Sequence, residues 1–413
     1  MARAWENEYK LLEERLKDSG FDIEATVQRL KKQHIETPSW AFMDGGTRFG
    51  VFPMAGAART VKEKFEDAAQ VHKYTGVAGS VAVHIPWDKV ADWSEMGAYA
   101  KSLGVTIGAV NPNVFQEAEY QFGSFGNVGA GVRKKALAHM RECVEIMKET
   151  GSKHLSLWFA DGTNFPGQGD FRARKQWFAD CLAETYALLS PGQIMLIEYK
   201  PFEPGFYHTD IADWGMAFAF ALHTGDRAKV LVDLGHHLHG ANIEHIVAFL
   251  LDEGRLGGFH FNNRKYADDD LTVGSTQPYE LFLIYNELAS GEDAGLAGEV
   301  AYMIDQSHTL KNKIEEMIQS VVNLQTSYAK ALLVDQKALA EAQEKNDVIL
   351  AEETLRAAYD TDVAPLLWRV RSEMNLPDPS SPLAGFRKSG YAEEKAKERG
   401  VAKATSAFTA GIE

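Results

Sequence analysis

The fold is decided by three consecutive pieces of sequence, HLSLWF (154–159), FRARKQWFADCLAETYALL (171–189) and IMLIEYK (194–200). The first and third pieces are short apolar runs, whereas the middle piece repeats apolar residues at helical spacing. Continuous rather than alternating apolar residues indicate strands that are covered on both faces, as in a parallel sheet. The stretch therefore predicts a strand, a crossover helix and a second parallel strand.

The same alternation of short apolar runs and helical stretches extends in both directions along the chain. Six further β-rich runs occur, at SWAFM (39–43), VAVHIP (81–86), VTIGAV (105–110), KVLVDLG (229–235), GGFHF (257–261) and AYMID (301–305). With the two runs quoted above they make eight predicted strands, separated by helical stretches such as 132–149. Eight parallel strands with helical crossovers fit an α/β fold of the (β/α)₈ TIM barrel type better than an open sheet, although periodicity alone leaves a doubly wound fold open.

Helical patterns flank this region at both ends. Apolar residues recur at helical spacing within residues 1–35, and again after the last strand in 313–335 and 362–374. We therefore predict an N-terminal helical segment at 1–35, a catalytic barrel at 36–335 and a C-terminal helical extension at 336–413. The extension is expected to pack on a neighbouring subunit or on its own barrel, and the tail beyond about residue 380 to be poorly ordered at its end.

Composition limits the classes of function. The 413 residues are 45% hydrophobic and 24% charged, as in ordinary globular proteins, and the formal net charge is −15. This charge argues against a nucleic-acid partner, because phosphate binding needs a clustered basic surface. The two cysteines, Cys143 and Cys181, are too few for a Cys-based zinc site and suit a reducing compartment. Since no apolar leader or long apolar run is found, we expect a cytoplasmic protein without a membrane partner.

Groups that commonly bind metals stand at the ends of the last four predicted strands. They are Glu198 with Lys200, Asp233 with His236, His260 followed by Asp268 and Asp270, and Asp305. In a barrel the carboxyl ends of the strands surround one mouth, so these side chains meet. Buried carboxylates repel one another and cost several kcal/mol each unless a cation compensates them. The pattern therefore predicts a metal centre.

The ligands suffice for two divalent ions that share one carboxylate. Glu198, Asp233, His260 and Asp305 would surround one ion, and Asp233, His236, Asp268 and Asp270 the other, so that Asp233 would bridge them. Carboxylate and imidazole ligands without thiolate suit Mn²⁺, which we expect first, as well as Co²⁺, Zn²⁺ or Mg²⁺.

The order of these motifs resembles the two-metal site of the xylose isomerase-like barrel superfamily. Within it the pattern is most similar to the L-rhamnose isomerases of broad sugar specificity, in HIPWDK (84–89), DGTNFPGQ (161–168), VDLGHH (232–237), GGFHFN (257–262), KYADDDL (265–271) and MIDQSH (303–308). Asp233 and His260 stand where xylose isomerase itself has Glu and Asp. These departures favour the rhamnose-isomerase branch and argue against xylose as the substrate.

The resemblance implies a metal-dependent aldose–ketose isomerase, a homotetramer that interconverts L-rhamnose and L-rhamnulose and accepts other aldoses. His84 would be the base that helps to open the sugar ring, and Lys200 and Asp270 would act with the metals in a 1,2-hydride shift. Proton abstraction through an enediol stays open as the alternative. The residues expected to bind the sugar are His84, Lys200 and three indoles at strand ends, Trp40, Trp87 and Trp158.

Three other functions compete with this interpretation. A sugar epimerase of the same superfamily would use one metal and two opposed carboxylate bases, and would favour Glu over Asp305 on the last strand. An apurinic-site endonuclease would need more histidine ligands and a basic groove. A barrel that binds sugar without turnover would keep its affinity after the metal is removed.

Overall fold

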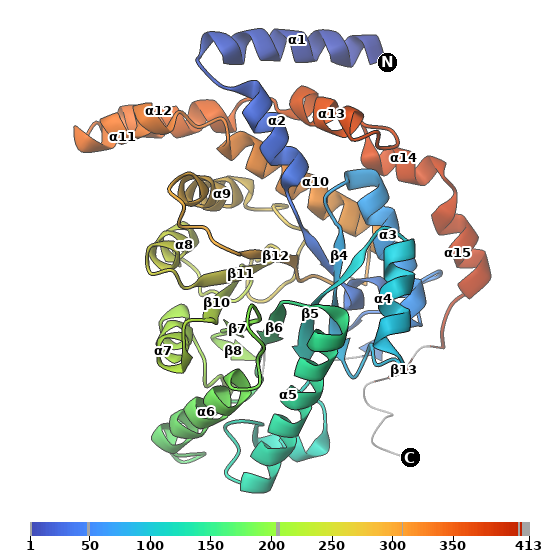
Figure 1. Ribbon diagram of the computed structural model, residues 1–413, viewed down its shortest axis with the longest axis vertical. Coiled ribbons are helices and arrows are strands. Elements are labelled where there is room, and N and C mark those ends of the chain that lie inside the picture. Colours follow the sequence, from blue (N-terminus) through green and yellow to red (C-terminus); the bar gives the residue numbers. More distant parts are fainter. Residues whose placement is uncertain (1, 48–49, 204–206, 308, 404, 407–413) are drawn as a thin grey trace.

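The barrel is formed by eight parallel strands that close on themselves (Figure 1). In this computed structural model, which describes residues 2–47, 50–203, 207–307, 309–403 and 405–406, the strands are ordered β1–β12–β11–β10–β7–β6–β5–β4. Their bounds are β1 Glu36–Pro38, β4 Ser80–Ile85, β5 Thr106–Pro112, β6 His154–Leu157, β7 Ile194–Glu198, β10 Ala228–Asp233, β11 Leu256–Phe261 and β12 Ala301–Ile304. Glu36 pairs with both Ser80 and Met303, which closes the ring. The predicted (β/α)₈ barrel is confirmed.

One helix follows each barrel strand and packs outside it. These helices are α3 Val61–Thr75, α4 Trp93–Ser102, α5 Ala130–Thr150, α6 Phe171–Tyr186, α7 Trp214–Thr224, α8 Ile243–Asp252, α9 Pro278–Asp293 and α10 Lys313–Ala331. Several begin at side-chain caps: Asp170 accepts from two backbone N–H groups of α6, and Thr60 forms a reciprocal capping box with Glu63 of α3. Such caps satisfy amides that have no partner within the helix, and each is worth about 1 kcal/mol.

The first predicted strand, 39–43, is wrong. Residues Ser39–Phe42 form a short 3₁₀ helix, η1, and the strand precedes it at Glu36–Pro38. Ala41 and Phe42 are fully buried, so the apolar run reflects burial in the core rather than a place in the sheet. A five-residue run with four apolar residues does not distinguish these two situations.

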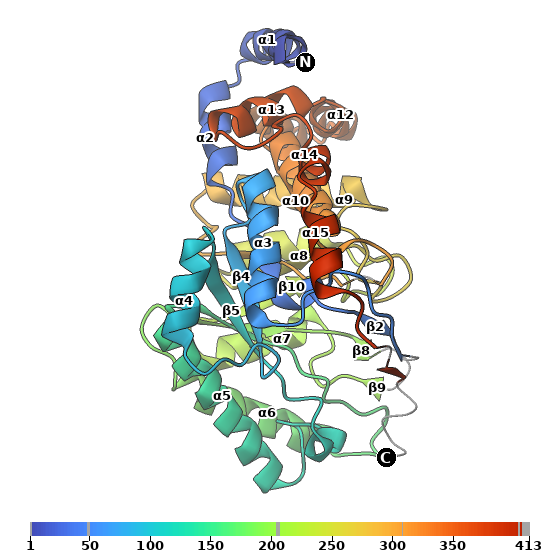
Figure 2. The same cartoon turned by 90° about the vertical axis from the view of Figure 1, so that its right-hand side faces the viewer.

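The chain ends extend the molecule on one side of the barrel. Helices α1 Ala2–Asp18 and α2 Ile23–Lys32 pack against α13 Ala364–Glu373, at the same end of the molecule as α11 Gln336–Glu344 and α12 Val348–Tyr359 (Figures 1 and 2). Helices α14 Pro382–Lys388 and α15 Tyr391–Arg399 then run along the outside of α3. Part of this extension packs on its own barrel: Phe386 contacts Tyr74 of α3, and Arg399 pairs with Asp67 at 2.7 Å. Most of the tail beyond residue 380 is thus helical, in α14 and α15, while residues 407–413, where poor order is expected, lie outside the described residues.

Four two-residue strands lie in loops and one near the C-terminal end. They are β2 Gly46–Thr47, β3 Gly50–Val51, β8 Phe202–Glu203, β9 Tyr207–His208 and β13 Thr405–Ser406. β13 pairs with β3, which brings the end of the chain to the loop after β1. His308, the last residue of the MIDQSH motif, is outside the described part of the chain.

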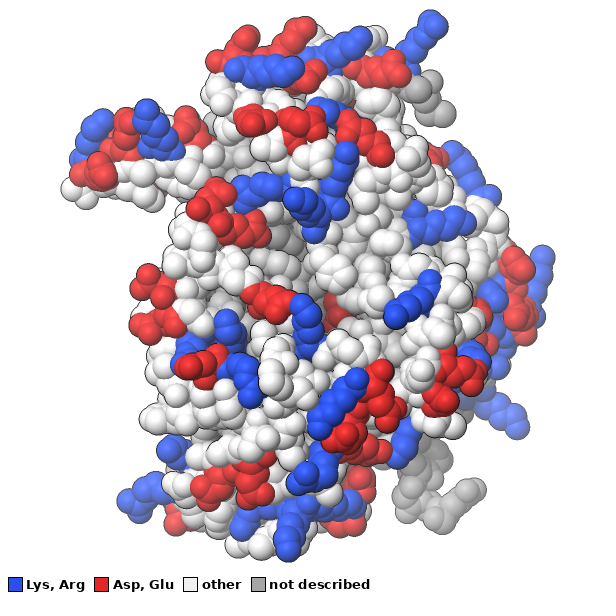
Figure 3. All heavy atoms as spheres, viewed as in Figure 1, with Lys and Arg blue, Asp and Glu red and all other residues white. Residues whose placement is uncertain are grey.

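The barrel interior is closed by an apolar layer. Ala82, Ala109, Leu196, Leu231 and Met303 are buried together inside the ring of strands. This layer fills the middle of the barrel, so a small molecule can reach only the ends of the strands. None of the described helices combines the length and apolar character needed to cross a membrane. On the face shown in Figure 3, basic and acidic side chains lie intermixed rather than in one basic strip.

Candidate active site

The predicted ligands meet because the barrel strands run parallel. Glu198 is the last residue of β7, Asp233 is the last residue of β10, and His260 of β11 lies opposite Asp233 in the strand register. Asp305 directly follows β12. All four therefore stand at the same end of the barrel, as parallel strands require.

The first predicted ligand set is assembled. One ligand atom from each of Glu198, Asp233, His260 and Asp305 lies within 4.8 Å of all the others. Nδ1 of His260 is 3.3 Å from Oε2 of Glu198 and 3.7 Å from the Oδ2 atoms of Asp233 and Asp305. One divalent cation at the centre of this group could contact all four residues.

The second set is assembled around the same Asp233, with one difference. Asp233, His236 and Asp268 bring their ligand atoms within 4.8 Å of one another. An N–H at Nδ1 of His236 reaches the carbonyl oxygen of Tyr199 at 3.0 Å, which leaves Nε2 facing Asp268. A histidine whose other nitrogen is held in this way is oriented for metal binding. Asp270 lines the same cavity but does not belong to this compact group.

The residues fit divalent cations because buried ligand atoms lack other partners. Oδ1 of Asp233 accepts hydrogen bonds from the backbone N–H of Gly235 at 2.7 Å and from Nδ2 of Asn262 at 2.9 Å. Its other oxygen, Oδ2, is buried without a hydrogen bond, as are Oδ1 of Asp268 and Nδ1 of His260. A buried polar atom without a partner costs about 1–3 kcal/mol. The protein thus holds one side of each ligand and leaves the other side free for a cation.

The charges of the site also favour a bound divalent cation. Burial raises the pKa of Asp270 well above its usual value, and Asp268 and Asp305 raise it further. Burial also raises the pKa of Asp233. Burial alone would lower the pKa of His236, but the neighbouring carboxylates Asp233 and Asp268 raise it well above normal. In the protein without a cation, bound protons compensate the clustered carboxylates, and a divalent ion would replace those protons.

A small cavity of about 180 Å³ opens above these groups. Eleven of the twelve side chains that the sequence indicated line it, and the twelfth, Asp233, is fully buried beside them. Nε1 of Trp40 donates to Oδ1 of Asp305 at 2.8 Å, so this indole also holds a ligand. The cavity is smaller than those that enclose drug-sized molecules and suits a compact polar one.

His84 lies in an aromatic wall of the cavity. Its ring stacks on Trp87 with the ring centres 3.9 Å apart and meets the edge of Trp40 at 5.6 Å. Burial lowers the pKa of His84 to about 3, so the imidazole is neutral near pH 7 and able to accept a proton. The backbone N–H of His84 donates to Asp88 at 2.7 Å, and Asp88 pairs with Lys64 at 2.6 Å. This buried ion pair fixes the loop that carries the ring.

Lys200 is not a free cation. Its Nζ lies 2.7 Å from Oδ2 of Asp268 and 3.0 Å from Oε2 of Glu203, and 5.0 Å from the ring centre of Trp158. Burial alone would lower its pKa, but the two carboxylates raise it above its normal value. Lys200 is therefore positively charged, and it positions Asp268 as well as facing the cavity.

Sequence reasoning missed several residues of the site. Asn262 donates to Asp233 and to the carbonyl oxygen of Asp305. It is the last residue of the GGFHFN motif, and this position at a strand end could have identified it as a site residue. Asn111, near the end of β5, lines the cavity and could have been found by the same rule. Phe115 also lines the cavity, but it lies in a loop, and no local pattern marks it.

The fold and the site define a (β/α)₈ barrel whose mouth is lined with carboxylates and histidines. The chain belongs to the xylose isomerase-like TIM barrel family, whose sequence model matches residues 65–283. It is 42% identical to a probable sugar isomerase of Rhizobium meliloti over 398 residues, which are 95% of this chain and 92% of that protein. It is also 43% identical to a probable sugar isomerase of Mesorhizobium japonicum over 400 residues, with the same coverage of both chains.

Solved structures with low sequence identity share the barrel. An L-ribulose 3-epimerase is 11% identical with a TM-score of 0.53, and the match covers 73% of this chain and 98% of the epimerase. A 3-keto-D-glucoside 4-epimerase from E. coli is 15% identical with a TM-score of 0.51, and the match covers 71% and 100% of the two chains. At these identities the likeness concerns the fold alone.

Proposed function

We propose that this protein is a sugar isomerase that interconverts an aldose and its ketose with two divalent cations, Mn²⁺ first among them, and that L-rhamnose is its preferred aldose. The observation that carries the proposal is the pair of ligand groups that share Asp233 beneath a small cavity with an aromatic wall. The two relatives named probable sugar isomerases, similar over nearly the whole chain, support it. A homotetramer in the cytoplasm is part of the same proposal.

The residues divide the work of binding between them. Glu198, Asp233, His260 and Asp305 would hold one cation, and Asp233, His236 and Asp268 the other, with Asp270 beside them. Bound there, the ions would supply a Lewis acid that polarises neighbouring oxygens of the sugar. The aromatic faces of Trp87 and Trp158 would pack on the C–H groups of the substrate and exclude water.

Two side chains of this site would accept a proton and stabilise negative charge during the reaction. The neutral ring of His84 would accept the proton of the anomeric hydroxyl as the sugar ring opens. The ammonium group of Lys200, held by Asp268 and Glu203, would stabilise negative charge that develops on O1 of the open-chain sugar. The hydrogen that moves between C1 and C2 travels within the sugar in a hydride shift, or through solvent if an enediol forms.

One contact favours isomerisation over epimerisation at the same kind of site. An epimerase of the type considered above needs two opposed carboxylates that are free to exchange protons with the substrate. Here Oδ1 of Asp305 accepts a hydrogen bond from Trp40, and its Oδ2 faces His260. Asp305 is thus engaged as a ligand, which leaves the last strand without the second base.

The deciding experiment is a panel of aldoses supplied with Mn²⁺. We expect ketose from L-rhamnose at the highest kcat/KM, with slower conversion of related aldoses, followed by NMR of the products. Deuterium at C2 of the aldose that reappears at C1 of the ketose indicates a hydride shift, whereas its loss to solvent indicates an enediol. No ketose from any aldose would contradict the isomerase, and an aldose product inverted at C2, next to the C1 carbonyl, would identify an epimerase instead.

We predict that His84→Gln lowers kcat/KM for L-rhamnose by about 10²–10⁴-fold, the usual contribution of general acid–base catalysis. Because His84 has a pKa of about 3, its protonation should cause no loss of rate between pH 8 and pH 5. The matched control is His245→Gln, an exposed histidine outside the active-site cavity, which should leave the rate unchanged. If His84 acts in ring opening, His84→Gln should lower kcat/KM far less for a triose, which cannot close into a pyranose ring, than for L-rhamnose. An equal loss for both substrates would contradict that role.

A further inference from the structure

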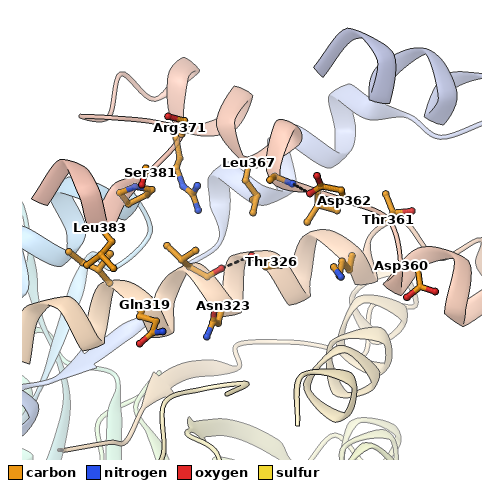
Figure 4. A pocket seen from close by; sticks show the side chains of 17 residues that line it. Gln319, Asn323, Thr326, Asp360, Thr361, Asp362, Leu367, Arg371, Ser381 and Leu383 are labelled. Carbon is orange, nitrogen blue, oxygen red and sulfur yellow. Dashed lines mark hydrogen bonds between the residues drawn. The ribbon is translucent and has the colours of Figure 1, made fainter. Parts of the chain in front are cut away.

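A second cavity, of about 560 Å³, lies between α10 and the C-terminal helices (Figure 4). Its walls come from α10, the turn before α13, α13 itself and the start of α14, and it shares no residue with the active-site cavity. Hydroxyl and amide groups are frequent in these walls, among them Gln319, Asn323, Thr326, Thr361 and Ser381. These polar groups stand among aliphatic side chains such as Ile318, Val322 and Leu367, and the cavity is large enough for a small metabolite.

Arg371 is the unusual residue of this cavity. It is only 4% exposed, and its guanidinium group points from α13 towards the cavity (Figure 4). Nη2 donates to the amide oxygen of Gln325 at 2.7 Å, and Nη1 is 3.5 Å from the carbonyl oxygen of Pro379. Nε is buried and has no hydrogen bond. The acceptors that Arg371 has are thus neutral.

The other buried arginines of the described chain all have a carboxylate. Arg399 pairs with Asp67 at 2.7 Å, Arg174 with Asp210 at 2.6 Å, and Arg264 with Glu280 at 3.8 Å. For Arg371 the described residues supply no such ion pair, and burial lowers the pKa of its guanidinium to about 10. A buried charge without a counter-ion costs several kcal/mol. The chain by itself leaves this cost uncompensated.

The two acids that line the cavity do not supply the missing charge. Asp360 and Asp362 lie at the end of the cavity away from Arg371 (Figure 4). Asp362 accepts from the backbone N–H of Ala364 at 3.0 Å, and Asp360 pairs with Arg356 at 2.9 Å. Lys330 also lines the cavity, and it faces these two acids rather than Arg371. The cavity therefore has a cationic end at Arg371 and an opposite end whose carboxylates could accept hydrogen bonds from hydroxyl groups.

We propose that this cavity binds a phosphate group, free or carried by a small sugar, with Arg371 as its counter-ion. The planar guanidinium group matches the oxygens of a phosphate and can donate to two of them, here through the remaining N–H groups of the Nη atoms. A phosphorylated sugar would place its hydroxyl groups towards Asp360, Asp362 and the amides of α10. This site is distinct from the catalytic one and does not depend on the proposed isomerase activity.

The test is calorimetric titration of the metal-loaded full-length protein with inorganic phosphate and, separately, with a hexose phosphate. We expect one saturable site that Arg371→Met weakens at least tenfold. Arg387→Met removes the same charge from an exposed side chain of α14 that does not line the cavity, and it should leave the affinity unchanged. Tighter binding of the hexose phosphate identifies a sugar-borne ligand, and equal binding identifies free phosphate. No saturable binding, or unchanged binding by Arg371→Met, overturns the proposal.

A second variant covers the case in which Arg371→Met does not fold. Ser381→Glu places a carboxylate on an exposed residue at the same end of the cavity as Arg371 (Figure 4). It should supply the missing counter-ion, raise Tm in the absence of ligand and abolish phosphate binding. Binding of phosphate by Ser381→Glu with the affinity of the unmodified protein would contradict the assignment of Arg371.

Discussion

Asp233→Asn should lower kcat/KM for the aldose by about a thousandfold and reduce the amount of bound metal. Asp233 is the carboxylate common to both ligand groups, and its Oδ1 is already held by Gly235 and Asn262. The amide keeps the size of the side chain but removes its negative charge from the centre of the site. Loss of one partner from a buried charged cluster costs about 3–5 kcal/mol, which corresponds to two to four orders of magnitude.

A second Asp→Asn variant serves as the control for this prediction. Asp252→Asn makes the identical chemical change on an exposed residue at the end of α8, and it should leave both rate and metal content unchanged. Activity is measured as ketose formed, and bound metal by elemental mass spectrometry. An Asp233→Asn protein with full activity and full metal content would refute the shared role of this carboxylate.

Removal of metal should abolish the activity reversibly. The buried ligand atoms of Asp233, Asp268 and His260 have no hydrogen-bond partner, so the described residues cannot complete the site alone. After dialysis against EDTA we expect no detectable ketose, a lower Tm because the bound ions stabilise the folded state, and recovery of both on addition of Mn²⁺ or Co²⁺.

A parallel sample treated with EDTA already saturated with Mn²⁺ controls for effects of the chelator itself and should keep its activity. Sugar affinity, measured on the same samples, separates an enzyme from a barrel that only binds sugar. Unchanged activity in protein shown to be free of metal would exclude the proposed metal dependence, whereas unchanged sugar affinity together with no turnover at any metal concentration would favour the non-catalytic barrel.

The site was predictable from sequence where chemistry and strand ends coincide. Glu198, Asp233 and His260 each follow or end an apolar run that can only be a buried strand. A barrel brings such positions together whatever the loops do. This is why the ligands were found without any knowledge of side-chain contacts. Asp270 shows what strand ends alone cannot predict. It lies in a loop and has a left-handed φ of 46°, so its distance from the other ligands depends on the conformation of that loop.

Other features depended on contacts between distant parts of the chain. The run 39–43 is apolar because η1 is buried in the core, and the same letters would serve a strand equally well. Helix α15 has few apolar residues, yet it is attached to the barrel by the ion pair of Arg399 with Asp67. Neither contact has a signal in the local sequence, because η1 is covered by α3, β4 and α10, and Arg399 is 332 residues from Asp67.

The sequence by itself thus determined the barrel, the end of the barrel where acidic and histidine side chains gather, and most residues of the candidate metal site. These follow from periodicity and from the order of residues along each strand, which are local properties. Only the tertiary structure decided that Asp270 stands outside the two compact ligand groups, that Lys200 is held between two carboxylates, and that Arg371 is buried without an ion pair among the described residues. Each of these depends on distances of a few ångströms between separate elements, which side-chain packing sets and periodicity does not record.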